Sequence, residues 1–276
     1  MERGKASGED GLVAEHLKYA HLAQTKLLVK LLNYILLYGL VPSLFGICIT
    51  ISILKESNAK SRLSTDEFWG ITVSPVLPKV FEQALLFNFE NYFVSSDEQF
   101  RFKKAIGCNH AILAVKSTID HFVKHGSTVN ICRLNISKAV DKIQHCILFD
   151  KLIKRCIHIS LLNVLLFWYS NSTCKVKWLH ALLFSYTLGA GVRQGGVLSP
   201  ILFSLYVDDL LQKLHASNLG CSIAGLCINS IIYADDLILS SLFVTELQHM
   251  VGLCVCELND VHLSVNPKKL YCLRIS

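Results

Sequence analysis

The sequence predicts a single mixed α+β domain. Stretches with the apolar spacing of helices alternate with short apolar runs typical of strands, and some of these runs are joined as hairpins. The chain has 276 residues, of which 52% are hydrophobic, so it can bury a sizeable core. No internal repeat or low-complexity linker interrupts it. We therefore expect one domain over residues 1–276.

The first half of the chain is expected to alternate helices with strands. Residues 12–38 have helical spacing, with signs of a break into two pieces. Proline at position 75 ends a short apolar run, as is typical of a strand end. The expected elements in order are a two-part helix over 12–38, strands over 47–54 and 68–75 with a polar connector between them, and helices over 77–93 and 109–125.

The second half has a similar alternation. Ser137 is expected to cap a helix that follows a strand and has Val140, Ile143 and Ile147 on one face. Ser199-Pro200 predicts another helix start, since serine caps well and proline suits the first turn. The expected elements in order are a strand over 129–136, helices after 137 and over 161–169, a hairpin from 175, a helix after 199, a hairpin over 231–239, a helix over 246–259 and a last short strand.

The segment Leu31–Leu54 raises the question of a membrane span. It has 24 residues without a formal charge, which is long enough for a spanning helix. Gly39 and Pro42 argue against this, because they are typical of a helix end followed by a new element. Membrane association through Leu31–Leu54 is kept as a second alternative, although a membrane partner is not the expected one.

Charge and cysteine content narrow the function classes. The 27 lysines and arginines exceed the 21 acidic residues, and a net charge of +6 suits a partner with phosphates without identifying one. Eleven cysteines without a C-x-x-C pair, together with no signal peptide, favour reduced thiols inside a cell. We expect an intracellular protein, in the nucleus or the cytoplasm, that is not secreted, and we see no structural zinc site.

Two adjacent carboxylates form the most informative local feature. Asp235 and Asp236 lie between apolar runs, and a hairpin turn would bring both to one spot, where Mg²⁺ prefers to bind oxygen ligands. An ordinary Asp-Asp turn is the alternative. Tyr206-Val207-Asp208-Asp209 has a similar pattern but lies inside the helix expected after Ser199-Pro200, so we exclude it as a site.

Two further segments suggest contact with a ligand. Gly191–Pro200 holds three glycines, which let a backbone approach a ligand closely. Gln99–Lys104 interleaves aromatic and basic side chains, a combination that can stack on bases and follow a phosphate backbone. An edge strand with a solvated basic face explains Gln99–Lys104 equally well.

Taken in order, these segments resemble the reverse transcriptase of non-LTR (LINE-type) retrotransposons. Arg193-Gln194-Gly195 with Leu198-Ser199-Pro200, followed by Tyr233-Ala234-Asp235-Asp236, is the most specific part of the match. The resemblance implies a right-hand polymerase with a mixed or antiparallel palm sheet packed on helices, the fingers mainly over about 1–128 and the palm mainly over about 129–276. The matching segments in order are 5–11, 70–82, 137–142, 191–200, 233–236 and 263–269.

The resemblance also implies roles for residues. Asp235 and Asp236 would be catalytic metal ligands for two Mg²⁺ ions. The nucleotide-binding positions would be Arg193, Gln194, Gly195, Val140, which faces the sugar, and Lys269, which steadies phosphate charge. The implied partners are an RNA or DNA template with a primer and deoxynucleoside triphosphates, with no obligate protein partner.

The chain departs from the family pattern at five positions, and at two of them Arg101 and Ala105 replace glycines usual in a loop. Asn135 replaces a catalytic aspartate, Val140 an aromatic residue beside the sugar, and Trp69 a common arginine. We interpret the chain as a degraded and truncated copy, with the thumb missing, whose RNA-directed DNA polymerase activity is lost or weak. The alternative is a catalytically dead remnant that still binds nucleic acid.

Overall fold

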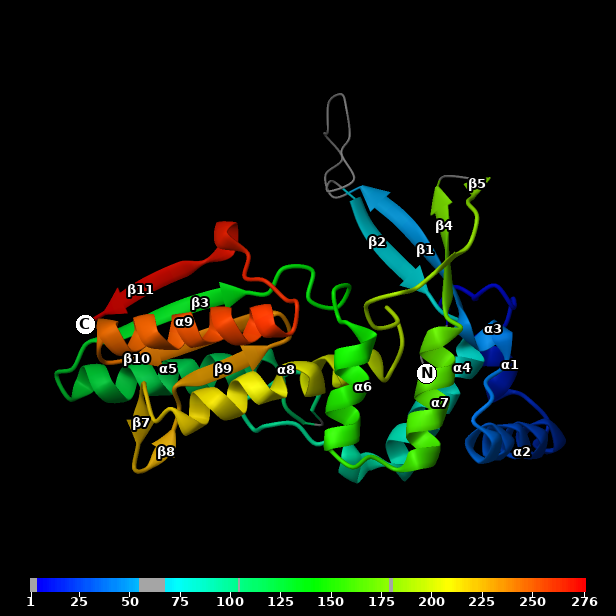
Figure 1. Cartoon of the computed structure of the whole chain (residues 1–276), viewed down its shortest axis with the longest axis horizontal. Coiled ribbons are helices and arrows are strands. Elements are labelled where there is room, and N and C mark those ends of the chain that lie inside the picture. The colour runs from blue at the N-terminus through cyan, green and yellow to red at the C-terminus, as the bar shows by residue number, and fades with distance from the viewer. Residues whose placement is uncertain (1–3, 55–67, 104, 179–180) are drawn as a thin grey trace. The chain divides into compact units, whose positions relative to one another are not determined.

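The computed structural model describes residues 4–54, 68–103, 105–178 and 181–276 (Figure 1). The chain divides into two compact units, each made of two separate segments. Unit 1 comprises Met1–Tyr92 and Phe149–Ser199, and unit 2 comprises Phe93–Leu148 and Pro200–Ser276. These boundaries differ from the expected division near residue 128, because 149–199 pack with the N-terminal segment. The assignment of fingers and palm to parts of the chain stays a prediction.

Unit 1 contains a mixed five-stranded sheet. Its strand order is β2-β1-β4-β5, with β6 also paired to β4; β1 and β4 run parallel, whereas the other pairs are antiparallel. The strands are β1 (Ile47–Leu54), β2 (Phe68–Val73), β4 (Thr173–Trp178), β5 (Ala181–Leu182) and β6 (Tyr186–Thr187). The helices of this unit are α1 (Ala14–Lys18), α2 (Leu22–Tyr38), α3 (Ser43–Gly46), α4 (Val76–Asn88), the 3₁₀ turn η2 (Glu90–Tyr92) and α7 (Ile159–Ser170).

Three aromatic rings form the centre of the core in unit 1. The ring centroids of Phe81 and Trp168 lie 5.6 Å apart, and those of Phe45 and Trp168 lie 6.1 Å apart. The indole N–H of Trp168 donates to the Phe45 carbonyl at 3.0 Å. Helix α7 is apolar on nearly all sides, as expected for a helix within a core. These rings lie beside the segment that carries the predicted nucleotide-binding residues.

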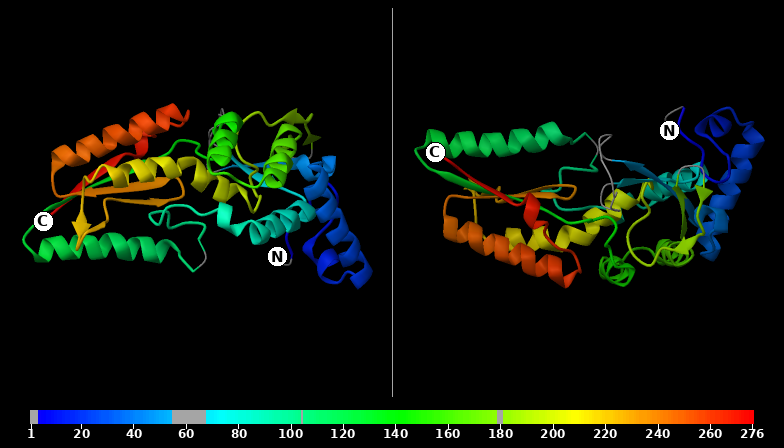
Figure 2. Two further views of the ribbon diagram at one scale, coloured as in Figure 1. Left: turned by 60° about the horizontal axis from the view of Figure 1, so that its bottom comes forward. Right: turned by 90° about the horizontal axis from the view of Figure 1, so that it is seen from above.

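Unit 2 is built on an antiparallel sheet of order β11-β3-β10-β9. Helix α5 covers one face, and α8 and α9 cover the other (Figure 2). The elements of this sheet are β3 (Val129–Asn135), β9 (Ser230–Tyr233), β10 (Asp236–Ser241) and β11 (Tyr271–Ile275), and its helices are α5 (Cys108–Lys124), α8 (Ser199–Ala216), α9 (Val244–Asp260) and the 3₁₀ turn η3 (Pro267–Lys269). A separate small hairpin joins β7 (Ser222–Ile223) to β8 (Leu226–Cys227), and α6 (His145–Lys154) spans the boundary between the units.

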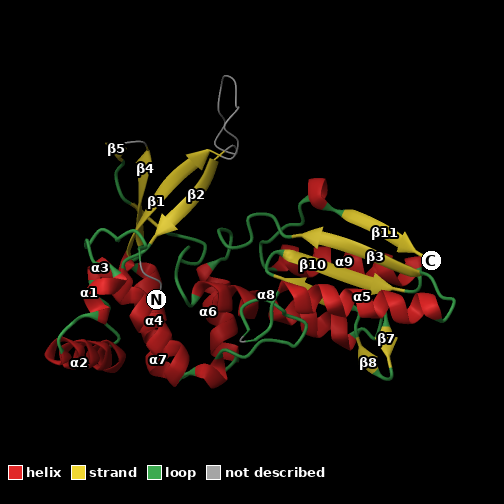
Figure 3. Ribbon diagram, turned by 180° about the vertical axis from the view of Figure 1, so that it is seen from behind, coloured by secondary structure: helices red, strands yellow, loops and turns green. Residues whose placement is uncertain are grey.

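Most of the expected elements are confirmed. The 12–38 helix is two pieces, α1 and α2 (Figure 3). Residues 231–239 lie in the β9–β10 hairpin, and the Tyr206–Asp209 sequence lies inside α8. Asp208 within it is buried and accepts hydrogen bonds from the Ser96 backbone N–H and the Gln212 side chain, at 2.7 and 2.9 Å. The polar connector over 55–67 lies outside the described residues.

The helix expected directly after Ser137 is wrong. Residues 137–142 form turns, and α6 begins only at His145. Lys138 has a positive φ of 48°, which interrupts regular helix geometry because non-glycine side chains rarely adopt it. Val140 therefore lies in a turn beside the end of β3 rather than on a helix face.

A single spanning helix over Leu31–Leu54 is also wrong. The segment holds the end of α2, then α3, then β1. Helix α2 stops because Gly39 takes a left-handed conformation, φ 71°, and donates its N–H to the Ile35 carbonyl. Within the described ranges, no helix has both the length and the apolar character needed to cross a bilayer.

Candidate functional site

The carboxylates Asp235 and Asp236 gather at one end of the sheet in unit 2. Asp236 pairs with Tyr233 across the β9–β10 hairpin and with Asn135 of β3 on its other side. Ala234 and Asp235 form the turn, and Ala234 has the left-handed φ of 59° that a tight hairpin turn requires. The Asp235 carbonyl accepts the N–H of Ile136 at 2.7 Å, which fixes the turn against the end of β3.

Asn135 connects both carboxylates through its side-chain amide. It is 3% exposed, and its Nδ2 donates to Asp235 Oδ2 at 2.9 Å and to Asp236 Oδ1 at 3.0 Å. Both hydrogens of the amide are therefore directed at carboxylate oxygens. A carboxylate at this position would have no hydrogen to donate, so the asparagine makes a contact that the family's aspartate cannot make when ionised.

Arg133, which precedes Asn135 by two residues on β3, neutralises the charge of Asp236. Its Nη2 donates to both oxygens of Asp236, at 2.9 and 3.0 Å, and its Nε donates to Oδ1 at 3.2 Å. The pair is partly open to solvent, so its contribution to stability is small, but its forked geometry orients the carboxylate. Arg133 was not identified from the sequence, because nothing local to it signals a partner 103 positions away.

The residues present do not fit a two-metal centre. Two carboxylates remain where three are expected, and the amide hydrogens of Asn135 occupy the space between them. Magnesium binds through several oxygen ligands in near-octahedral geometry, whereas Asp236 is already engaged by Arg133. Across the residues that the structure describes, no cluster of three or more histidine, cysteine, aspartate or glutamate side chains is arranged to hold a metal ion.

A third segment, 263–269, packs against the same end of β3. Val265 forms an isolated bridge with Ile136, and the Asn266 N–H donates to the Asn135 carbonyl at 2.8 Å. This places η3, which ends with the exposed Lys269, next to β3. The predicted contact of Lys269 with phosphate stays a prediction, as does that of Val140 with a sugar.

In unit 1, Gln194 and Gly195 are held against the end of β2. Thr72 Oγ1 donates to Gln194 Oε1 at 3.2 Å, and Ser74 Oγ donates to the Gln194 carbonyl at 3.3 Å. Gly195 has φ 79°, and a Cβ there would lie 2.8 Å from the Thr72 carbonyl oxygen. Only glycine fits, so this part of the motif is fixed by close backbone packing. The nucleotide-binding roles of Gln194 and Gly195 stay predictions.

Arg193 points into the core of unit 1. Its side chain is 2% exposed, its guanidinium lies 4.5 Å from the Trp168 ring centroid, and its Nη1 lies 3.5 Å from Glu82 Oε1. Glu82 is likewise buried and accepts the Val197 N–H. Burial raises the pKa of Glu82, while the Arg193 charge and that N–H counteract the rise. The predicted direct contact of Arg193 with a nucleotide stays untested, and its observed contacts brace the 193–197 loop.

Glu82 is a residue whose role the sequence reasoning missed. It appeared only as the end of the matched segment 70–82, with no role given to it. A signal was available: Glu82 shares a helix face with Pro78, four positions before it, and Leu85, three positions after it, and a carboxylate on an apolar, buried face needs a cationic partner.

The aromatic and basic segment at Gln99–Lys104 lies along the edge of the sheet in unit 2. The Phe100 N–H donates to the Ile232 carbonyl at 3.0 Å, and the Ile232 N–H donates to the Glu98 carbonyl at 2.9 Å. The Arg101 guanidinium lies 5.3 Å from the Tyr233 ring centroid. These contacts cover the free edge of β9 next to the hairpin. Lys104 lies outside the described residues.

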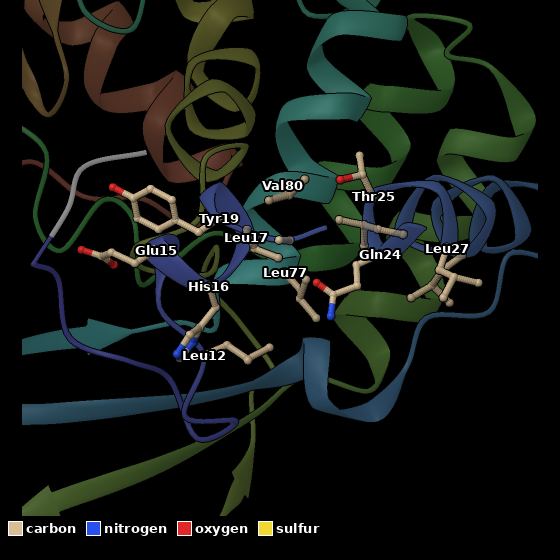
Figure 4. A pocket seen from close by; sticks show the side chains of 13 residues that line it. Leu12, Glu15, His16, Leu17, Tyr19, Gln24, Thr25, Leu27, Leu77 and Val80 are labelled. Carbon is tan, nitrogen blue, oxygen red and sulfur yellow. The ribbon is translucent and has the colours of Figure 1, made fainter. Parts of the chain in front are cut away.

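A pocket of 940 Å³ in unit 1 is separate from all of these residues. It lies among α1, α2 and α4 and is lined mainly by apolar residues, with Glu15, His16 and Gln24 among its polar residues (Figure 4). None of the predicted catalytic or nucleotide-binding residues lines it.

Comparison with solved structures defines the fold class. The structure of telomerase from Candida albicans with a TWJ fragment of telomeric RNA matches 84% of this chain and 43% of that chain, with a TM-score of 0.58 and 11% identity. Apo telomerase from Candida tropicalis, truncated from its C-terminal domain, matches 88% of this chain and 54% of that one, with a TM-score of 0.58 and 13% identity. At such identities the likeness concerns the fold, and the fold is that of a reverse transcriptase with fingers and palm.

Sequence comparison places the chain within a family. The family described as "Reverse transcriptase (RNA-dependent DNA polymerase)" matches residues 56–274, and the chain belongs to it. The Pol polyprotein of the type-2 retrotransposable element R2DM of Drosophila melanogaster is 26% identical over 268 residues, which are 97% of this chain and 25% of that protein. The R2 Pol polyprotein of Nasonia vitripennis is 23% identical over 270 residues, which are 98% of this chain and 26% of that protein.

The predicted resemblance to a non-LTR retrotransposon is thus confirmed. This chain spans about a quarter of the length of these relatives. Reverse transcriptases generally use a divalent metal ion.

Proposed function

We propose that this chain is a reverse transcriptase domain of R2-type retrotransposon origin whose nucleotidyl transfer is impaired by Asn135. The activity would extend a primer 3′-hydroxyl with deoxynucleoside triphosphates on an RNA or DNA template. The observation that carries the proposal is the contact of the Asn135 amide with both Asp235 and Asp236. It supplies the carboxylates with hydrogen-bond donors at the place where the family's chemistry needs a third anionic oxygen.

The expected loss of rate is large. Removing one preorganised electrostatic group typically lowers kcat by about 10²–10³, and a ligand shared between two metal ions should matter more. Asn135 changes both the charge and the direction of the hydrogen bonds at the site. We therefore expect activity far below that of the corresponding aspartate variant.

Primer extension on an RNA template with Mg²⁺ tests this proposal. The original protein is compared with Asn135→Asp, and Asp235→Asn serves as the blank. Asn130→Asp is a matched control, since Asn130 lies on the same strand, is also buried, and donates to the Ser241 and Leu242 carbonyls instead. We expect the Asn135→Asp variant to extend the primer, and the original protein, Asp235→Asn and Asn130→Asp not to extend it. Extension by the original protein above the blank would refute it.

A catalytically dead nucleic-acid-binding remnant is the second candidate. The net charge of +6 and the exposed Lys268 and Lys269 beside the hairpin favour it. It predicts binding to a template-primer duplex that weakens steeply with salt and no extension by any variant, including Asn135→Asp. Binding that is indifferent to salt would eliminate this candidate.

The cell compartment belongs to the same proposal. All eleven cysteines are free thiols, and five of them are more than nine-tenths buried, which suits a reducing environment such as the nucleus or cytoplasm. Thiol counts on protein isolated under alkylating conditions would test this.

A further inference from the structure

Two cysteines of unit 2 face each other across neighbouring strands. Cys132 of β3 and Cys272 of β11 are directly opposite in the antiparallel register, and their sulfur atoms lie 3.3 Å apart. Residues paired in this way have Cβ atoms about 4.5–5.5 Å apart, whereas a disulfide has them about 3.5–4.5 Å apart with the sulfurs about 2.0 Å apart. A small approach of the two strands is enough to form the bond.

The surroundings of the pair permit that approach. Strand β11 is an edge strand bonded to β3 alone within the sheet, and four of its five residues are exposed. Cys272 is exposed, while Cys132 is fully buried. Burial, together with the neighbouring Cys272, raises the pKa of Cys132 to about 12, so that thiol stays protonated until its partner reacts. An oxidant in solution therefore meets Cys272 first.

We propose that Cys132 and Cys272 are an oxidation site, at which a peroxide oxidises the two thiols to an intramolecular disulfide. The Cys272 thiolate attacks one peroxide oxygen and becomes a sulfenic acid, and the other oxygen leaves as water after taking a proton. The Cys132 sulfur then attacks the Cys272 sulfur, loses its proton, and displaces the sulfenic oxygen as a second water. Two S–H bonds are lost, one S–S bond is formed, and one peroxide is reduced to two waters.

The bond would join segments 140 positions apart in the sequence. It ties β11 to β3, the strand whose Arg133 and Asn135 contact the carboxylates. Closing so long a loop restricts the unfolded chain strongly, so the oxidised protein should unfold at a higher temperature. In a reducing compartment the pair stays as thiols and the disulfide forms only transiently.

Other thiols of the chain provide internal comparisons. Cys48 of β1 and Cys174 of β4 are also register partners, but both are buried, so a dissolved oxidant reaches neither directly. Cys254 of α9 is buried, and that burial, with a smaller contribution from neighbouring Cys132, raises the pKa of Cys254 to about 12. Cys256 is exposed on the same helix, which makes Cys256→Ser a matched control.

The test is hydrogen peroxide titration of the reduced full chain at low concentration, followed by alkylation, non-reducing peptide mapping and thermal unfolding. We expect loss of two thiols, a linked Cys132–Cys272 peptide, and an unfolding midpoint that rises by several degrees and returns with dithiothreitol. Cys272→Ser and Cys132→Ser should each abolish the link and the rise, whereas Cys256→Ser should keep both. Overoxidation of Cys272 without a link, or a Cys132–Cys254 link instead, would overturn the proposal.

Discussion

Replacing Asn135 by aspartate is expected to make the folding of unit 2 depend on a divalent cation. In the original protein the amide donates to two carboxylates at 2.9 and 3.0 Å. The variant places a third carboxylate at the same distances, with no hydrogen to donate while it is ionised. Without a cation the three carboxylates repel one another, and with a cation they become its ligands.

The size of the effect follows from these distances. Two charges about 3 Å apart repel by about 5 kcal/mol at an effective dielectric constant near 20. Keeping an ordinary aspartyl carboxyl protonated at pH 7 costs about 4 kcal/mol, so one of the three is expected to keep its proton instead. The free energy of unfolding in the absence of a cation should therefore fall by about 4 kcal/mol at pH 7.

The pH dependence has a definite sign. The carboxyl introduced at position 135 would have a higher pKa in the folded protein than in the unfolded chain. Stability is then greatest below the unfolded value of about 3.9 and is lost as the pH rises. The deficit should be smaller at pH 5 than at pH 7. Mg²⁺ at a hundred times its dissociation constant should restore about 2.7 kcal/mol.

Hydrogen exchange of peptides from β3 and β10, with Mg²⁺ or with EDTA, measures this effect. Tryptophan fluorescence would not, because Trp69, Trp168 and Trp178 all belong to unit 1. Asn130→Asp is the control for a buried charge on β3, because the Asn130 amide donates to two backbone carbonyls rather than to carboxylates, and Mg²⁺ should leave its exchange unchanged. The reasoning is refuted if Mg²⁺ slows hydrogen exchange in the original protein as much as in Asn135→Asp, or slows it in neither protein.

Three further substitutions test other parts of the structure. Arg193→Met should cost about 3–5 kcal/mol at pH 7, because it leaves Glu82 buried without its cation. This loss of stability should shrink toward pH 4, because the pKa of Glu82 is raised and its ionisation destabilises the fold as the pH rises. Adding Glu82→Gln to Arg193→Met should recover much of the lost stability. Urea unfolding at pH 7 and pH 4 checks both expectations. Tyr206→Phe should cost about 1–3 kcal/mol, because the Val261 carbonyl loses a donor at 2.7 Å; an unchanged urea midpoint would contradict it. Gly195→Ala should lower the thermal midpoint, because the new Cβ would clash with the Thr72 carbonyl, whereas Gly189→Ala meets no atom within 4 Å and should have little effect.

The sequence predicted the elements whose signals are local. The hairpin over 231–239 combines two apolar runs with a short polar turn, and the helix after Ser199 has a start signal followed by regular spacing. The turns over 137–142 were mistaken for a helix because Ser137 resembles a cap and Ile143 and Ile147 have helical spacing. The positive φ of Lys138, which excludes that helix, leaves no trace in the residue type.

The parts of the site that escaped prediction are contacts between distant segments. Glu82 and Arg193 are 111 positions apart, and Arg133 and Asp236 are 103 apart. The resemblance implies that Asn135 is a departure from the family, but its effect was judged only as a lost charge. Its second effect, two hydrogen bonds donated to the remaining carboxylates, depends on the register of β3 with β10, which the sequence does not specify.

At this site the requirements of folding and of chemistry are opposed. Three carboxylates at the end of a sheet repel one another until a cation joins them, so a working centre is unstable by itself. Asn135 removes that repulsion and satisfies both Asp235 and Asp236 with hydrogen bonds, and Arg133 neutralises Asp236 further. If Asn135 replaces a catalytic ligand, as we propose, the same substitution would stabilise the hairpin that carries the other two carboxylates. Preservation of the hairpin is therefore no evidence that the site works, because the contacts that stabilise the fold do not depend on catalysis.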